Sequence, residues 1–252
     1  MAVVGRHALV TGGGVGIGKA VAEALAQAGV EVTICGRRAE PLEALAAAHD
    51  NIHAAVADVT DEASVEAMYR EAEEARGPFD IVVANAGVAS SAPAHKTSLE
   101  DWNRILQVNL TGAFLTVRPC LAGMAARKSG RIVFIASVAG LRGTAYVAPY
   151  VASKHGVVGL MRALAAELLM TGVTVNAVCP GFVETDMLEE SVRRVVEKTG
   201  RSAEEARRSF AEINPNHRLI KPDEVAAAVM WLVSDAAKSV TGQPIPISGG
   251  GL

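Results

Sequence analysis

Short apolar runs rich in β-branched residues alternate along the chain with longer stretches of helical periodicity. The run VEVTIC at 30–35, for example, has the length and residue types of a buried strand. This alternation predicts right-handed βαβ crossovers and a parallel sheet, and hence a doubly wound α/β (Rossmann) fold. The expected strands are 7–11, 30–35, 52–57, 80–84, 131–136, 173–178 and 244–247, and the expected helices are 17–28, 39–48, 62–76, 99–126, 150–171 and 222–235.

The pattern indicates one structural core. The chain has 252 residues, of which 50% are hydrophobic, and it contains no proline- or serine-rich linker and no repeat. Single α/β domains of roughly 200–250 residues are common. We therefore expect a single dinucleotide-binding and catalytic domain over 1–252. Within it, residues 184–216 mix apolar and charged residues at helical spacing, which is typical of an amphipathic lid over a substrate or of a plain surface helix pair.

Composition and charge exclude several partners. The net charge is −3 with both signs spread along the chain, so there is no basic footprint for nucleic acid and no polybasic patch for a membrane. No apolar run approaches the length of a membrane span, and the N-terminus has no secretory leader pattern. The cysteines Cys35, Cys120 and Cys179 form no C-x-x-C motif, so neither a disulfide framework nor a zinc site is indicated. We expect a cytoplasmic protein.

Two arrangements of histidines could indicate a metal site or a serine hydrolase. His49 and His53 have the spacing of metal ligands on a helix, but the Asp50-Asn51 pair between them is typical of a turn, so no metal is expected. His155 stands beside a lysine on an expected helix, yet the serine hydrolase motif G-x-S-x-G is absent. A metal centre and a serine hydrolase are both disfavoured.

The stretch TGGGVGIGKA joins the first expected strand to the first expected helix. At such a junction, backbone N–H groups and the positive end of the helix dipole favour a phosphate, and glycines let it approach. The spacing is not the common G-x-G-x-x-G, because the sixth position from Gly12 is Ile17. Taken alone, the stretch also fits an ordinary turn. Its alternative spacing, T-G-x-x-x-G-x-G, is carried by Thr11, Gly12, Gly16 and Gly18.

The end of the second expected strand indicates which dinucleotide would fit. A carboxylate about 20 residues beyond the glycines would bind the ribose 2′-hydroxyl of NAD. The chain has Gly36-Arg37-Arg38 there instead. The arginine fork suits a 2′-phosphate, so Arg37 and Arg38 favour NADP over NAD. The alternative is that both arginines are solvated charges at the start of the next helix.

Tyr150 and Lys154 form the strongest chemical signal, because a spacing of i, i+4 places a phenol and an ammonium on one helix face. A nearby positive charge lowers the pKa of a tyrosine from about 10 and makes it a general acid or base. On its own such a pair is also common on exposed helices. Ser137 strengthens the signal, since it directly follows the strand expected at 131–136 and could hold a carbonyl oxygen beside the tyrosine.

With these motifs in order, the sequence resembles the short-chain dehydrogenase/reductase family over nearly its whole length. The resemblance implies a single-domain Rossmann enzyme that works with a nicotinamide cofactor. The matching motifs are TGGGVGIG at 11–18, Asp58, Asn85-Ala86-Gly87, Asn109, Ser137, Tyr150 with Lys154, and Pro180-Gly181 with Thr185.

The resemblance implies four catalytic residues. Tyr150 would donate the proton, and Ser137 would orient the substrate carbonyl. Lys154 would lower the pKa of the tyrosine and bind the nicotinamide ribose. Asn109 would bend its helix and hold a water in the proton relay.

The same resemblance implies the cofactor site. Asp58 would meet the adenine, and Thr185 would bind the carboxamide. Val15 departs from the family pattern, because many NADP-dependent members have a basic residue there, so NADP is expected chiefly from Arg37. The expected cofactor-binding residues are Gly12, Gly16, Ile17, Gly18, Arg37, Arg38, Asp58, Val59, Asn85, Ala86, Gly87, Tyr150, Lys154, Pro180, Gly181, Val183 and Thr185.

Local stretches indicate the substrate class. APYVASKHGVVG and TGVTVNAVCPGFVETDM look like the corresponding parts of polyketide ketoreductases and β-ketoacyl reductases, which implies reduction of a β-keto thioester or a related hydrophobic ketone by NADPH. Residues 138–147 are small and apolar, in keeping with such a substrate. Arg127 and Lys128 could meet an acidic acyl carrier protein, but Thr171 stands where a second basic residue is often found. A carrier-protein partner therefore stays open.

Two other functions also stay open: an NAD(P)-dependent alcohol or 3-hydroxyacyl dehydrogenase working in the oxidative direction, and a non-catalytic NADP-binding sensor. The helix expected at 150–171 is apolar on most sides and so needs a second burial surface. Either the 184–216 lid or a second copy of the chain could provide that surface. The family resemblance implies a homotetramer, with this helix and the one at 99–126 paired across a two-fold axis.

Overall fold

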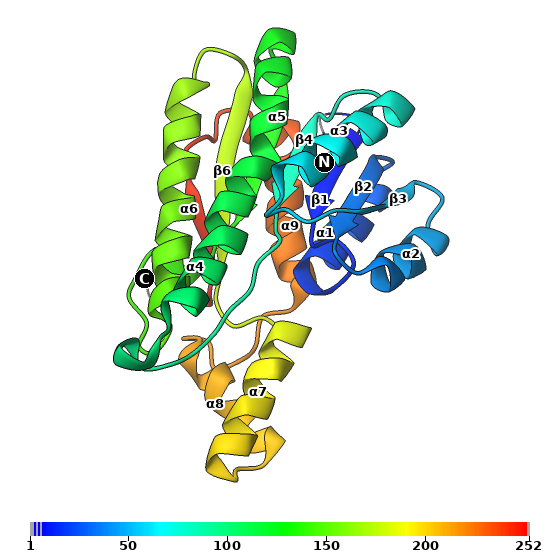
Figure 1. Ribbon diagram of the computed structural model, residues 1–252. Helices are drawn as coiled ribbons and strands as arrows, with labels where there is room; N and C mark the ends of the chain where they lie inside the picture. The colour runs from blue at the N-terminus through cyan, green and yellow to red at the C-terminus, as the bar shows by residue number, and fades with distance from the viewer. Residues whose placement is uncertain (1–2, 4, 6, 251–252) are drawn as a thin grey trace.

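A parallel sheet forms the centre of the computed structural model, which describes residues 3, 5 and 7–250 (Figure 1). Within these residues the sheet has 7 strands in the order β3-β2-β1-β4-β5-β6-β7, and each neighbouring pair is parallel. The doubly wound α/β prediction is confirmed. The strands are β1 His7–Thr11, β2 Glu31–Gly36, β3 Ile52–Val56, β4 Ile81–Ala84, β5 Gly130–Ile135, β6 Val173–Pro180 and β7 Pro244–Ile247.

Helices cover both faces of the sheet, so its central strands are apolar on both sides. In β1, Leu9 packs into one core layer, while Ala8 and Val10 pack into the other. The first layer is covered by α3 Glu62–Arg76, α5 Gly112–Arg127 and α6 Ala148–Glu167, and the second by α1 Gly16–Gln27, α2 Ala39–Ala47 and α9 Pro222–Leu232.

The helix expected at 99–126 is divided by a change of helix type. It consists of α4 Leu99–Leu106, a π-helical turn at Gln107–Thr111 and then α5. By length and composition alone, the run Leu99–Arg127 could cross a membrane. In the fold, however, the buried side chains Val117, Cys120 and Met124 pack into the core layer that faces the sheet. Its apolar content is therefore accounted for by the core.

Two expected helices end at least three residues earlier than predicted. Helix α6 ends at Glu167, not 171, and α9 ends at Leu232, before a 3₁₀ turn at Asp235–Ala237. The apolar pattern continues past the end of α6, but Leu169 and Met170 are exposed. The chain reverses at Gly172, where φ is +75° and an added Cβ would lie 2.4 Å from the Lys128 carbonyl oxygen. Residues 168–172 form a turn into β6, which the apolar periodicity alone does not reveal.

Residues 184–216 form a helix pair, α7 Asp186–Thr199 and α8 Ala203–Ile213. Figure 1 shows the pair in yellow and orange, projecting beyond the carboxyl end of β6. It has its own small apolar cluster, in which Leu188, Val192 and Ala206 are buried. The two remaining short turns are 3₁₀ helices at Ala94–Lys96 and Val138–Gly140.

Candidate active site

The expected catalytic residues meet at the carboxyl edge of the sheet. Ser137 lies just beyond β5, where its Oγ accepts a hydrogen bond from Ala139 N at 3.1 Å. Tyr150 lies in the first turn of α6, and its side chain is hydrogen-bonded to that of Ser137. Two hydroxyl groups from separate elements thus converge on one point, where a carbonyl oxygen could be bound.

Lys154 is buried beneath this pair, with 5% of its surface exposed. Its Nζ donates to the Ile135 carbonyl oxygen at 2.8 Å and lies 5.7 Å from the centre of the Tyr150 ring. Burial lowers the pKa of this ammonium to about 8, and Cys179 opposes the shift slightly. An added Cβ at Gly87 would lie 3.7 Å from the Nζ. Lys154 therefore faces the loop after β4 as well as the tyrosine.

One electrostatic expectation was wrong for the protein without cofactor. Lys154 was expected to lower the pKa of Tyr150, but burial raises that pKa above its ordinary value, and the hydrogen bond with Ser137 offsets only part of the rise. The physical reason is desolvation: burial penalises the charged phenolate by more than the hydrogen bond with Ser137 stabilises it, and Lys154 Nζ donates to the Ile135 carbonyl oxygen. The phenol is therefore held in its protonated form.

Asn109 lies in the π-helical turn, which agrees with the expected bend. Its Oδ1 accepts from Val88 N at 2.8 Å, while its Nδ2 donates to Val88 O at 2.9 Å and to Ser153 Oγ at 3.0 Å. The amide thus joins the loop after β4 to α6, one residue before Lys154. The sequence reading did not single out Ser153, although a serine on the apolar face of a helix is a signal that its hydroxyl has a buried partner.

The glycine stretch packs so closely that side chains are excluded. An added Cβ at Gly18 would lie 2.2 Å from the Gly12 carbonyl oxygen, and Gly12 and Gly16 both have positive φ, +64° and +54°. Asn85 holds this turn from β4, because its Nδ2 donates to Thr11 O at 2.8 Å. The backbone at the start of α1 is therefore bare and fixed, as an anion site at a helix N-terminus requires.

A cavity of about 220 Å³ continues from this turn across the ends of β1, β2 and β4. Arg37 and Arg38 are exposed at its rim. Hydrogen bonds from Thr60, and more weakly the charge of Arg37, hold the pKa of Asp58 below its ordinary value. The residues present thus fit a dinucleotide: the glycine turn could hold its phosphates, and the two arginines could meet the adenosine ribose end. The cavity is lined by Gly12, Gly14, Val15, Cys35, Gly36, Arg37, Arg38, Pro41, Leu42, Ala57, Asp58, Val59, Ala86, Gly87, Val88 and Val108.

The remaining expected cofactor residues follow β6. Ser137 Oγ donates to the Pro180 carbonyl oxygen at 3.4 Å, and an added Cβ at Gly16 would lie 3.1 Å from Thr185 Cγ2. Residues 181–185 thus lie between Ser137 and the glycine turn. Ile17, in the first turn of α1, packs with the core layer on the other face of the sheet.

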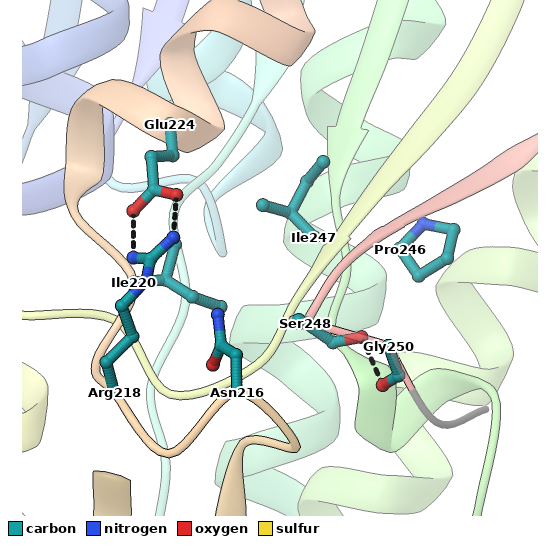
Figure 2. A pocket seen from close by; sticks show the side chains of 9 residues that line it. Asn216, Arg218, Ile220, Glu224, Pro246, Ile247, Ser248 and Gly250 are labelled. Carbon is teal, nitrogen blue, oxygen red and sulfur yellow. Dashed lines mark hydrogen bonds and ion pairs between the residues drawn. The ribbon is translucent and has the colours of Figure 1, made fainter.

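A larger cavity, of about 340 Å³, lies elsewhere, beside the last strand. Figure 2 shows Arg218 and Glu224 facing each other there, with two hydrogen bonds of 2.7 and 2.6 Å between them. Their charges neutralise each other, and none of the expected catalytic residues lines the cavity. The cavity of greater volume is therefore not the one beside the expected catalytic residues.

The histidines considered as metal ligands have other contacts. His53 lies in β3, and its Nε2 is 2.7 Å from Glu31 Oε2. His49 Nε2 is 3.7 Å from Glu23 Oε1. Across residues 3, 5 and 7–250 there is no group of three or more His, Cys, Asp or Glu side chains that could hold a metal ion.

Residues 6–195 match the family described as short chain dehydrogenase. The chain belongs to this family. It is 38% identical over 251 residues to the 3-oxoacyl-acyl-carrier-protein reductase of Aquifex aeolicus, covering 98% of this chain and 97% of the relative. It is also 38% identical over 253 residues to the D-beta-hydroxybutyrate dehydrogenase of Cupriavidus necator, covering 98% and 97%. The fold matches a solved variant of actinorhodin polyketide ketoreductase with NADPH, with a TM-score of 0.93 and 38% identity over 97% of this chain and 96% of that chain.

The chain is thus an oxidoreductase of the short chain dehydrogenase family, and relatives that share nearly its full length act on ketones or on the corresponding alcohols by their names.

The buried ammonium gives a pH-dependent stability that can be measured. The pKa of Lys154 is about 8 in the folded protein and 10.5 in its reference state. Between pH 8 and 10.5 the lysine therefore binds more protons in the unfolded chain than in the folded protein, so the free energy of unfolding increases as the pH rises. Relative to a Lys154→Met variant, the wild type should gain on the order of 3 kcal/mol from pH 7 to 11. Urea unfolding without cofactor would measure this, and a pH-independent difference would contradict it.

Proposed function

We propose that this protein reduces a ketone to a secondary alcohol with NADPH. The observation that carries the proposal is the convergence of Ser137 and Tyr150 at the sheet edge, with Lys154 buried below them and the glycine-lined cavity alongside. A protein that only binds a dinucleotide could use Lys154 to hold the ribose, but it does not need the hydroxyls of Ser137 and Tyr150 to converge on one point. This favours the enzyme over a sensor.

The roles of the side chains follow from their contacts. Bound NADPH would supply the hydride for the carbonyl carbon. The Ser137 hydroxyl would donate a hydrogen bond to the carbonyl oxygen, and the Tyr150 phenol would give that oxygen its proton. Lys154 would hold the nicotinamide ribose and supply positive charge below the ring. Asn109 would keep the π-helical turn in place, and its proposed water would lie on the path that returns the proton to Tyr150.

The protonation state of Tyr150 fits its proposed role as the proton donor. Burial raises the pKa of the phenol, so at neutral pH the side chain is a proton donor. Oxidation of an alcohol would require the phenolate. The relative named D-beta-hydroxybutyrate dehydrogenase keeps this second direction open as an alternative.

We further propose a hydrophobic or β-keto thioester substrate. Support comes from the relative that is a 3-oxoacyl reductase and from the apolar cluster of the α7–α8 pair beyond the site. An acyl carrier protein is a weaker proposal for the partner. Arg127 and Lys128 are both exposed, but Arg127 donates to the Phe79 carbonyl oxygen at 2.8 Å and is therefore partly engaged within the chain.

A panel of ketones tests the function directly. With β-keto thioesters, diketones and aryl ketones, we expect NADPH oxidation on at least one substrate. A Tyr150→Phe variant keeps the ring but lacks the proton, so turnover should fall by roughly 10²–10⁴ while NADPH still binds. Tight NADPH binding with no turnover on any substrate would instead support a sensor, and unchanged turnover in the variant would remove Tyr150 from the reaction.

Cofactor choice is proposed to depend on Arg37, which lies at the cavity rim with its charge close to Asp58. A charge-assisted contact to the 2′-phosphate contributes about 1.5–3 kcal/mol, or roughly 10–150-fold in affinity. Arg37→Ala should therefore raise the Kd of NADPH by that factor and leave the Kd of NADH nearly unchanged. Fluorescence titration with both cofactors measures this. Equal weakening of both would mean that Arg37 is structural, and a wild-type preference for NADH would overturn NADP as the cofactor.

Assembly into a tetramer is also proposed, because the outward face of α6 is exposed and the α7–α8 pair forms a separate cluster instead of covering it. Gly159 lies on that face, and an added Cβ there meets nothing within 4 Å in the single chain. Gly159→Gln should therefore leave the monomer folded but clash across a paired helix. Light scattering should give four times the chain mass of 26.1 kDa for the wild type and a smaller assembly for the variant. A monomeric wild type would contradict the proposal.

A further inference from the structure

Residues 181–185 are held in place from three directions. On one side, Gly181 N donates to Ile247 O at 2.9 Å. On another, Ile220 N donates to Phe182 O, and Glu184 N donates to Ile220 O, both at 2.9 Å. The third side is occupied by a side chain, Asn214, which lies 32 residues along the chain from Phe182.

The side-chain amide of Asn214 forms hydrogen bonds with both the N–H and the C=O of Phe182. Its Oδ1 accepts from Phe182 N at 3.0 Å, and its Nδ2 donates to Phe182 O at 3.0 Å and to Arg218 O at 2.7 Å. The side chain is 2% exposed. An added Cβ at Gly181 would lie 2.4 Å from Oδ1, so the amide occupies the space next to this glycine. The Asn214 amide therefore makes the two hydrogen bonds to Phe182 that the backbone of a neighbouring strand would make, at the point where the chain leaves the sheet.

The gripped segment connects to the reaction site at both ends. Pro180, directly before it, accepts the hydrogen bond from Ser137 Oγ at 3.4 Å. Thr185, at its end, lies against Gly16 of the glycine turn. A shift of residues 181–185 would therefore move Pro180, which is hydrogen-bonded to Ser137. It would also move Thr185, which is expected to bind the carboxamide of the nicotinamide.

The same amide lies where the α7–α8 pair joins the sheet. Asn214 is the residue that ends α8, and the ring of Phe182 packs on Phe210 of α8, with 5.1 Å between the ring centres. Thus Phe182 is attached to the helix pair through its ring and to the end of that pair through its backbone. Movement of the helices would reach residues 181–185 through these two contacts.

We propose that Asn214 is a positioning residue, which holds residues 181–185 in the geometry that binds the nicotinamide end of the cofactor and supports Ser137. The proposal rests on the proposed function for its cofactor, but it assigns to Asn214 a role that no catalytic motif of the sequence carries. It also explains why an amide, with both a donor and an acceptor, is buried at this turn: Phe182 presents both an N–H and a C=O to it.

Asn214→Ala removes the grip and leaves the N–H of Phe182 without this acceptor. We expect kcat to fall roughly 10–100-fold, because small misplacements in a reaction site have effects of this size. The Kd of NADP should rise about 10-fold. The Kd of adenosine 2′,5′-bisphosphate, which lacks the nicotinamide, should stay within about twofold, since the adenine end is bound by other elements.

Asn176 provides a matched control. It is a fully buried asparagine in β6 that grips backbone in the same way, donating to Val240 O at 2.8 Å and accepting from Gln243 N at 3.1 Å, but it holds the segment before β7. Asn176→Ala should lower Tm about as much as Asn214→Ala while kcat and both Kd values stay close to wild type. If Asn214→Ala does not fold, Asn214→Ser, which keeps a polar group there, should show the same selective loss at smaller size.

Hydrogen exchange at Phe182 gives a readout that does not depend on turnover. Its amide should exchange faster in the Asn214 variant but not in the Asn176 variant. Equal weakening of NADP and adenosine 2′,5′-bisphosphate, or loss of kcat in both variants alike, would show a merely structural asparagine and overturn the proposal. Failure of the proposed function is distinct, because the wild type would then turn over no ketone, whereas the two binding titrations could still be compared.

Discussion

Parallel pairing of β1, β4, β5 and β6 is the constraint on which the site depends. Neighbouring parallel strands all end at the same edge of the sheet, so the residues that follow them are brought together even though they are far apart in sequence. The pairing continues past the strands themselves, since Ala136 N donates to Val178 O and Asn85 N donates to Thr11 Oγ1. These hydrogen bonds fix the first residues of the loops that follow the strands, where the expected site residues lie.

The edge is also where the protein places polar groups that its core would otherwise exclude. Lys154 is buried with its ammonium on a backbone carbonyl, and burial lowers its pKa to about 8. Tyr150 is held in its protonated form by the same apolar surroundings. Such an arrangement costs folding free energy, because burial disfavours the charged form of a lysine. In the proposed function, this arrangement provides a proton donor and a cation that are in place before any ligand binds.

Beyond the sheet, the α7–α8 pair is attached to this edge through few residues. Phe182 and Asn214 make the connection, one through an aromatic contact and both through hydrogen bonds between side chain and backbone. Leu219, which follows the pair, also packs into its apolar cluster, so these contacts together help to set the position of the pair relative to the sheet. A substrate bound between the helices and Ser137 would therefore be placed by the same contacts that place residues 181–185.

The order of strands and helices, the glycine turn and the tyrosine–lysine spacing could all be predicted from the sequence, because they depend on local periodicity and on spacing within one element. A bend at Asn109 was expected only through a family resemblance, and its form, a π-helical turn, came from the structure. Tertiary structure decided the rest: α6 ends at Glu167 although the apolar pattern continues beyond it, and the raised pKa of Tyr150 comes from its burial. The grip of Asn214 on Phe182 likewise joins residues that the sequence separates widely. Local pattern determines which elements form, whereas burial and long-range contact exist only after those elements have packed together.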